Sequence, residues 1–196
     1  MNAEERVRAH FSDTIDTQTR AREALSATVA EAARRLADTL KSGGRILVCG
    51  NGGSASDAQH FAAEFTNRFE RERPPLAAIA LTTDTSALTA IGNDYSFDQV
   101  FSKQVQALAR PGDALVAIST SGGSPNVRLA VEAAHAADAW VLALTGRDGG
   151  ALARALDDKK DMELRVPAER TAHIQEVHIV LLHCLCDLVD GILYPQ

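Results

Sequence analysis

The stretch that decides the fold is residues 113–124, DALVAISTSGGS. Its apolar first half fits a buried strand, its second half is a turn of small and hydroxylated residues, and an amphipathic helix is expected to follow over 124–137. The same theme occurs earlier, where residues 45–49, which are apolar after Arg45, lead into Gly50-Asn51-Gly52-Gly53-Ser54. Two strand–loop–helix units of this kind predict an α/β protein with a parallel sheet.

Apolar runs and helical periodicities alternate along most of the chain. We expect strands near 45–49, 77–81, 113–118, 140–145 and 161–166, and helices near 54–68, 84–91, 98–109, 124–137 and 170–191. Several of these runs are apolar throughout, as in strands that a parallel sheet buries on both faces. The pattern predicts a doubly wound α/β sheet, in which ligands bind at the carboxyl ends of the strands. Both Ser/Gly loops follow such ends, so both are expected at one pocket.

The chain is expected to form one domain, 1–196, with N-terminal helices over 1–43 and an α/β core over 44–196. Apolar residues recur at helical spacing from about 3 to 42, with a break expected near 24–27. These helices carry more apolar residues than one helix pair needs. They either pack between subunits of an oligomer, which we favour, or simply cover the sheet.

Composition narrows the class of protein. The formal net charge of −6 and the lack of a basic stripe argue against a protein that coats nucleic acid. No apolar run approaches the roughly 20 residues of a membrane span, and the polar N-terminus predicts no secretory signal. The three cysteines, Cys49, Cys184 and Cys186, lie in apolar surroundings, which predicts reduced core thiols in a cytoplasmic protein.

The two loops have the composition of an anion site. Backbone N–H groups and hydroxyls that converge beside a helix N-terminus favour an anion. Neither loop contains Lys or Arg, so the P-loop lysine is missing and nucleotide hydrolysis is disfavoured. The alternative is two ordinary tight turns, but hydroxyls at Ser119, Thr120, Ser121 and Ser124 favour a bound phosphate.

Two further pairs stand on predicted helices. His60 and Glu64 are one turn apart and share a face, so they either grip a metal or form a surface pair. Gln175 and His183 are two turns apart on one side of the last helix. His183 lies in an apolar stretch, where a satisfied core histidine is the usual explanation. His178 is expected on the helix surface or in a subunit contact.

Six motifs occur in a fixed order. They are CGNGGS at 49–54, HFAxE at 60–64, GND at 92–94, STSGxS at 119–124, LTGxDGG at 144–150 and IQExH at 174–178. Together they resemble the sugar isomerase (SIS) family, and within it the phosphoheptose isomerases, over nearly the whole chain. The resemblance implies a homotetramer of flavodoxin-like subunits, each a five-stranded parallel sheet with N-terminal helices. It also implies conversion of sedoheptulose 7-phosphate to D-glycero-D-manno-heptose 7-phosphate through an enediol, the first step toward the ADP-heptose of lipopolysaccharide core.

The resemblance also implies the site residues. Glu64 would be the base and His183 the general acid. Zinc would be held by positions matching His60, Glu64, Gln175 and His183, although glutamine is an unusual zinc ligand and the set would accept other divalent ions. Phosphate would lie on Ser119, Thr120, Ser121 and Ser124. The remaining substrate contacts would come from Asn51, Gly52, Gly53, Glu64, Asn93, Asp94 and Gln175. Arg68, one turn past Glu64, either steadies substrate or a neighbouring subunit or is a surface arginine.

A relative of different function is the main alternative. The chain also resembles the tetrameric initiator-associating protein that binds the replication initiator DnaA, for example in FERERP at 69–74 and HCLCDL at 183–188. That adaptor lacks the residues matching Glu64 and His183, and this chain has both, which favours the enzyme. A sugar-phosphate sensor is disfavoured because no DNA-binding module accompanies the domain.

Three positions depart from the family pattern. Gly123 stands where the family usually has Asn, His173 where Arg usually precedes IQE, and Ala172 where some members have Asp. The loss of these groups predicts weakened contacts to the distal hydroxyls, with lower turnover or a changed sugar preference.

Overall fold

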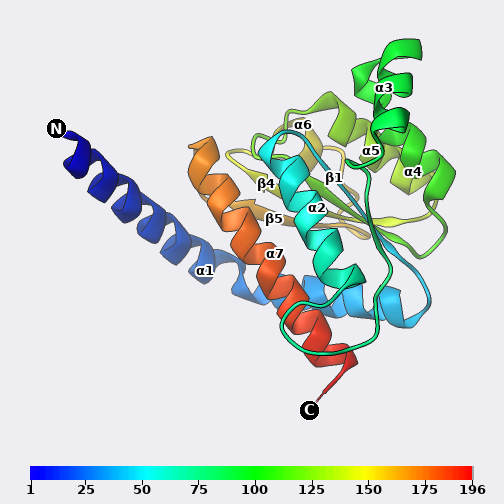
Figure 1. Cartoon of the computed structure of the whole chain (residues 1–196), viewed down its shortest axis with the longest axis horizontal. Coiled ribbons are helices and arrows are strands. Elements are labelled where there is room, and N and C mark those ends of the chain that lie inside the picture. The colour runs from blue at the N-terminus through cyan, green and yellow to red at the C-terminus, as the bar shows by residue number, and fades with distance from the viewer. Residues whose placement is uncertain (196) are drawn as a thin grey trace.

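The protein is built on one parallel sheet of five strands in the order β2-β1-β3-β4-β5 (Figure 1). The computed structural model describes residues 1–195. The strands are β1 (Ile46–Gly50), β2 (Ala78–Ala80), β3 (Ala114–Ile118), β4 (Trp140–Gly146) and β5 (Met162–Val166). Each lies within one residue of its expected bounds. The order is that of the doubly wound flavodoxin-like sheets, whose switch point lies between β1 and β3, so the expected fold class is confirmed.

Helices cover both faces of this sheet. They are α1 (Ala3–Lys41), α2 (Gly53–Thr66), α3 (Thr85–Asp94), η1 (Phe97–Gln99), α4 (Ser102–Leu108), α5 (Pro125–Ala136), α6 (Gly150–Ala153) and α7 (Thr171–Leu193). Because side chains alternate along a strand, Ile46 and Val48 point into the layer of α1, α2 and α7. Leu47 and Cys49 point into the opposite layer, against α3 to α6. Among the described residues, no helix has the length and apolar character needed to cross a membrane.

The expected break in the N-terminal helix is wrong. α1 runs unbroken for 39 residues from a capping box in which Asn2 and Glu5 satisfy each other's backbone N–H groups. Residues 24–27, ALSA, contain no Gly or Pro, and Leu25 is buried against α7. The first half of α1 extends away from the body of the molecule (Figure 1). Val7, Phe11 and Ile15 on this half are 57–66% exposed.

Two expectations for α7 are also wrong. His178 is fully buried rather than on the surface, and its Nε2 donates to the carbonyl of Thr145 on β4 at 2.9 Å. Cys184 is exposed rather than in the core, although Cys49 and Cys186 are buried as expected. Both corrections follow from the orientation of α7, which packs on β4 and α1 and leaves a stripe that includes Val180, Cys184 and Leu188 uncovered.

Candidate active site

The two Ser/Gly loops lie side by side at the switch point. Their strands are paired up to Gly50 and Ile118, so both loops leave the same edge of the sheet. The Asn51 and Asn126 amides donate to each other's oxygens, at 2.8 Å in both directions. This reciprocal pair joins the loop after β1 to the first turn of α5. The sequence did not single out Asn126, which is 75 residues from its partner.

The loop after β3 presents hydroxyls beside the N-terminus of α5. The Ser119 and Ser124 hydroxyl oxygens are 3.2 Å apart, and the Ser121 hydroxyl accepts from the Gly123 N–H at 3.2 Å. Gly122 has a φ of +62°, and a Cβ there would lie 1.9 Å from the Gly149 carbonyl oxygen, so the turn requires glycine. Ser124 occupies the N-cap position of the 12-residue α5 without a side-chain hydrogen bond to the helix, and the helix dipole there favours an anion.

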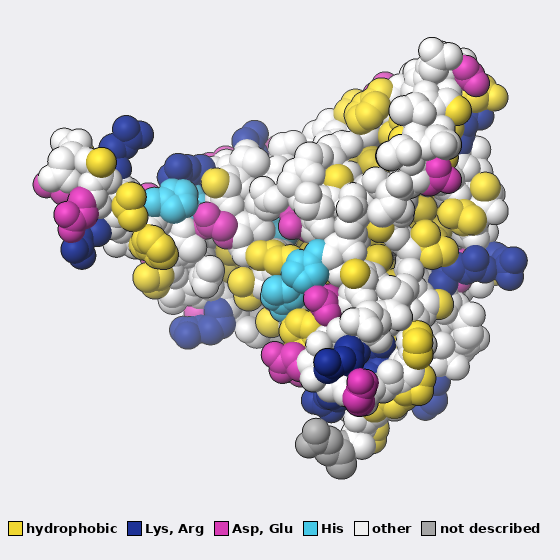
Figure 2. Space-filling view, viewed as in Figure 1, with side chains coloured by type: hydrophobic (Ala, Val, Ile, Leu, Met, Phe, Trp, Pro, Cys, Tyr) yellow, Lys and Arg dark blue, Asp and Glu magenta, His cyan; other side chains and the backbone are white. Residues whose placement is uncertain are grey.

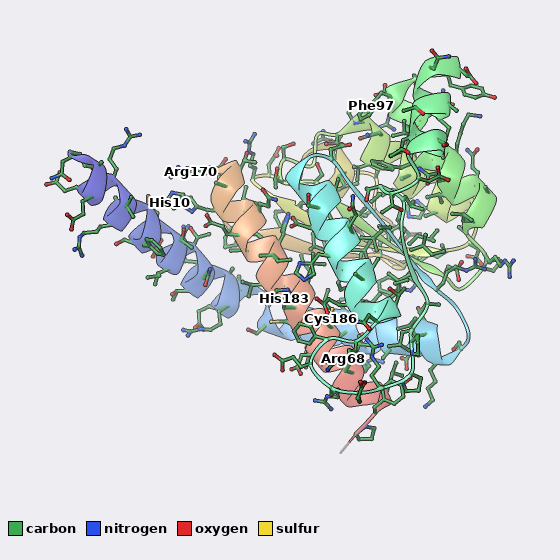
Figure 3. The ribbon with its side chains drawn as sticks, viewed as in Figure 1. His10, Arg68, Phe97, Arg170, His183 and Cys186 are labelled. Atoms are coloured by element: carbon green, nitrogen blue, oxygen red, sulfur yellow. The ribbon has the colours of Figure 1, made fainter. Side chains whose placement is uncertain are left out.

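A second group of polar side chains lies between α2 and α7. His60 Nε2 is 2.9 Å from Glu64 Oε1 on the same face of α2. Across the gap, the ring of His183 meets that of His60 edge-on at 5.1 Å and packs at 5.5 Å from the ring of Phe69. Figure 3 shows His183 on α7 facing α2, and Figure 2 shows histidine and acidic side chains together on this surface. The structure therefore brings together His60, Glu64 and His183, three of the four expected metal ligands.

Gln175, the fourth, belongs to the same surface. It lines a pocket of about 350 Å³ between α2 and α7, together with Asp57 and His60. A Cβ on Gly53 would lie 2.1 Å from Gln175 Nε2, so glycine at the start of α2 leaves room for this amide. The Gln175 amide nitrogen donates to Asp57 Oδ2 at 3.4 Å, so the amide oxygen of Gln175 is not used in this contact.

Asp57 is a site residue that the sequence reasoning missed. Its side chain is buried, and burial raises the pKa of its carboxyl group, an effect that the Gln175 hydrogen bond and the nearby His60 oppose. The spacing of Asp57 and His60, three residues apart on α2, places them on one face and could have revealed it.

The types of donor suit a divalent cation. Two imidazoles and one carboxylate lie between α2 and α7, but the ligand atoms of His60, Glu64 and His183 are not all within 4.8 Å of one another. Imidazole and carboxylate are preferred by zinc and its neighbours in the first transition series. Neighbouring residues link this region to the hydroxyl loop. Asn126, in the first turn of α5, bonds to Asn51 in the loop after β1. Gly53, at the start of α2, lies against Gln175.

Other expected site residues lie elsewhere. Asn93 and Asp94, exposed at the end of α3, bond to each other at 2.9 Å and belong to the opposite helical layer from His183. Arg68 is exposed past the end of α2, 3.6 Å from Glu72 (Figure 3). By contrast, Gly52 and Gly123 are exposed within the two loops of the candidate site, and Ala172 is exposed on the wall of the α2–α7 pocket.

The comparisons with known proteins agree with this fold. The SIS domain profile matches residues 9–146. The phosphoheptose isomerase of Methylibium petroleiphilum is 59% identical over 187 residues, covering 95% of this chain and 93% of its own. The structure of the phosphoheptose isomerase from Neisseria gonorrhoeae matches at 57% identity with a TM-score of 0.92, covering 97% of this chain and 100% of that one. That from Francisella tularensis matches at 46% identity with a TM-score of 0.95 and the same coverage. The chain therefore belongs to the SIS-domain family and, within it, to the phosphoheptose isomerases.

Proposed function

We propose that this chain interconverts sedoheptulose 7-phosphate and D-glycero-D-manno-heptose 7-phosphate. The observation that carries the proposal is that His60 contacts both Glu64 and His183. Neighbouring residues connect this group to the hydroxyl-lined N-terminus of α5. These two features would supply a phosphate site and an acid–base pair. A non-catalytic adaptor for DnaA has no need of that acid–base pair.

The phosphate end is proposed on the loop after β3. Hydroxyls of Ser119, Thr120, Ser121 and Ser124 and the N-terminus of α5 would bind the dianion without a cationic side chain. Asn51 and Gly52 lie next to this loop and would contact the sugar. Asn93 and Asp94 would contribute further substrate contacts from α3.

The reaction end is proposed at Glu64 and His183. Moving the carbonyl from C2 to C1 removes a proton from C1 and delivers one to C2 through an enediol. Glu64, only 21% exposed, would carry that proton between the two carbons. His183 would donate to and accept from the sugar oxygens, and Phe69, packed on its ring, limits the positions that the imidazole can take.

We further propose a zinc ion on His60, Glu64, Gln175 and His183. When bound, it would polarise the substrate carbonyl and stabilise negative charge on its oxygen. Asp57, by accepting from the amide nitrogen, would leave the Gln175 oxygen free to bind the ion.

A homotetramer is proposed because the α1–α7 surface is apolar. A groove of about 360 Å³ runs between these helices, lined by Leu25, Val29, Val180 and Leu188 among others, and the apolar stripe on α1 continues beyond it. Exposed apolar area of this kind marks interaction surfaces. A cytoplasmic location is proposed with it, since Cys49, Cys184 and Cys186 form no disulfide among the described residues.

The deciding experiment is product formation from sedoheptulose 7-phosphate by purified protein, with and without zinc, beside Glu64→Gln. The variant keeps the size of the side chain but not its basicity, so kcat should fall by about 10²–10⁴-fold with unchanged oligomeric state. Glu72→Gln, an exposed carboxylate beyond the helix, is the matched control and should retain full activity. Turnover by Glu64→Gln at the native rate would refute the assignment of the base.

A further inference from the structure

A second cluster of possible metal ligands lies outside the site described above. His10 on α1 and His173 and Glu176 on α7 place their ligand atoms within 4.8 Å of one another. His10 Nε2 is 3.2 Å from Glu176 Oε1, and His173 Nδ1 is 3.2 Å from Glu176 Oε2. The His10 and His173 rings are 4.9 Å apart. Figure 3 shows His10 beside the start of α7, well separated from His183.

These separations match the size of a small cation site. Zinc–nitrogen and zinc–oxygen bonds of about 2.0–2.1 Å in a tetrahedron place neighbouring ligand atoms about 3.3 Å apart. Two imidazoles with one carboxylate form a known three-ligand set for zinc, with the fourth position left to water. We propose that His10, His173 and Glu176 bind a divalent cation of the zinc type at the junction of α1 and α7.

Thr14 and the two histidines surround the carboxylate of Glu176. The Thr14 hydroxyl donates to Glu176 Oε2 at 2.7 Å and lies 3.1 Å from His173 Nδ1. Thr14 therefore orients the carboxylate as an outer partner of the proposed site. His173 is only 4% exposed, so its ring is held in place by packing.

One contact opposes the cation. Arg170 Nη1 lies 3.0 Å from His173 Nε2, the ring nitrogen away from Glu176. This bond favours the tautomer with its proton on Nδ1, whereas cation binding through Nδ1 requires the other tautomer. Arg170 is exposed at the head of α7 and is free to turn into solvent. Removing its side chain should strengthen cation binding, which separates this proposal from a simple hydrogen-bonded clamp.

The site would join two parts of the molecule that otherwise meet through few polar contacts. His10 belongs to the half of α1 that extends from the body (Figure 3). Glu176 follows Gln175 directly and lines the same pocket as His60. A cation here would fasten α1 to α7 and neutralise a carboxylate on the wall of the candidate active site.

The test uses the full chain carrying His60→Ala and His183→Ala, which removes two ligands of the zinc site proposed above. After dialysis against EDTA, Zn²⁺ is titrated by calorimetry and Co²⁺ by its visible absorption. We expect saturable binding of about one equivalent, weakened at least about 10-fold by His10→Ala, because even outer partners of a metal site are worth that much. Arg170→Ala should tighten it. His135→Ala, at a histidine that pairs with Asp161, is the matched control and should change nothing.

His10→Ala is the main test variant because the His10 side chain is 40% exposed, so its loss should perturb the fold little. Circular dichroism checks that each variant folds. Should the doubly substituted background not fold, the same comparison is made in the native chain, where His10→Ala should remove one equivalent of Zn²⁺. A folded background that binds no Zn²⁺, or an affinity equal with and without His10, would show that the cluster is a hydrogen-bonded clamp only and would overturn the proposal. Neither result bears on the isomerase, which is measured separately through Glu64→Gln.

Discussion

Arg73 donates to Asp190 at 2.8 Å, and both side chains are only 1% exposed. The same guanidinium donates to the carbonyls of Glu64 and Phe65, each at 2.7 Å, and so caps the last turn of α2. One buried cation therefore holds the backbone of the proposed base against α7. Glu64 is positioned by an ion pair whose two members are 117 residues apart in the chain.

Asp190→Asn is expected to destabilise the protein by about 3–5 kcal/mol, because it leaves the buried guanidinium without a counter-charge. Urea unfolding at fixed protein concentration measures the change. Asp187→Asn is the matched control, since its partner Arg71 lies 3.9 Å away and that pair is partly exposed, which predicts a loss of less than about 1 kcal/mol. Equal losses in the two variants would contradict the role given to Arg73.

Ser121→Ala combined with Ser124→Ala is expected to raise the KM for phosphosugar far more than it lowers kcat. In the proposed phosphate site the two hydroxyls bind a group remote from the reacting carbons, so their loss should remove binding shared by the ground and transition states. Steady-state kinetics separate the two constants. Thr19→Ala, a hydroxyl bonded within α1, should change neither, and an unchanged KM in the double variant would exclude this loop as the phosphate site.

Stability is expected to fall as the pH drops from 6.5 toward 4, in part through His178. Burial lowers the pKa of His178 to about 4, against the opposing hydrogen bond to the Thr145 carbonyl. The unfolded chain, with a histidine pKa near 6.5, binds the proton more readily in that interval, so protonation favours unfolding. The full contribution, roughly 3 kcal/mol, is present above pH 6.5. His178→Gln, which keeps a donor for Thr145, should flatten the dependence of unfolding free energy on pH, and an unchanged slope would contradict it.

The sequence predicted the strands well because each is a short apolar run bounded by turn residues, as 113–124 shows. The predicted break in α1 is wrong because a change in the phase of the apolar pattern resembles the end of a helix. Val7, Phe11 and Ile15 are exposed in the described chain, whereas Leu25 and Val29 pack on α7. The surface position predicted for His178 is wrong because α7 contacts the sheet on one side and α1 on another. Helical periodicity alone does not tell which of these sides is buried in the core.

The site residues also divide into those that a local pattern predicts and those that depend on long-range packing. His60 with Glu64, and the hydroxyls of 119–124, are local patterns that periodicity and motif order reveal. Asp57 on Gln175 and Asn51 on Asn126 are contacts across 118 and 75 residues. Their existence depends on how α2, α5 and α7 are placed around the sheet, which no local pattern encodes.

Leu188→Glu is expected to dissociate the proposed oligomer. Leu188 and Cys184 both line the apolar α1–α7 groove, and a charge buried in an apolar interface is strongly unfavourable. Sedimentation should give a mass near the 20.9 kDa of one chain for the variant. Tyr95→Glu, on an apolar side chain 61% exposed at the end of α3, is the control and should leave the assembly intact.

Cys184 reports the same event independently. In the assembled protein a thiol reagent should modify it slowly, and in Leu188→Glu it should react at the rate of an exposed thiol. Cys49 should stay unreactive in both, because burial raises its pKa to about 12 and blocks access. A Leu188→Glu protein with native mass and a protected Cys184 would place the subunit interface elsewhere. If Cys184 reacts freely in the protein of native sequence, the groove is uncovered, and the main support for the tetramer is lost.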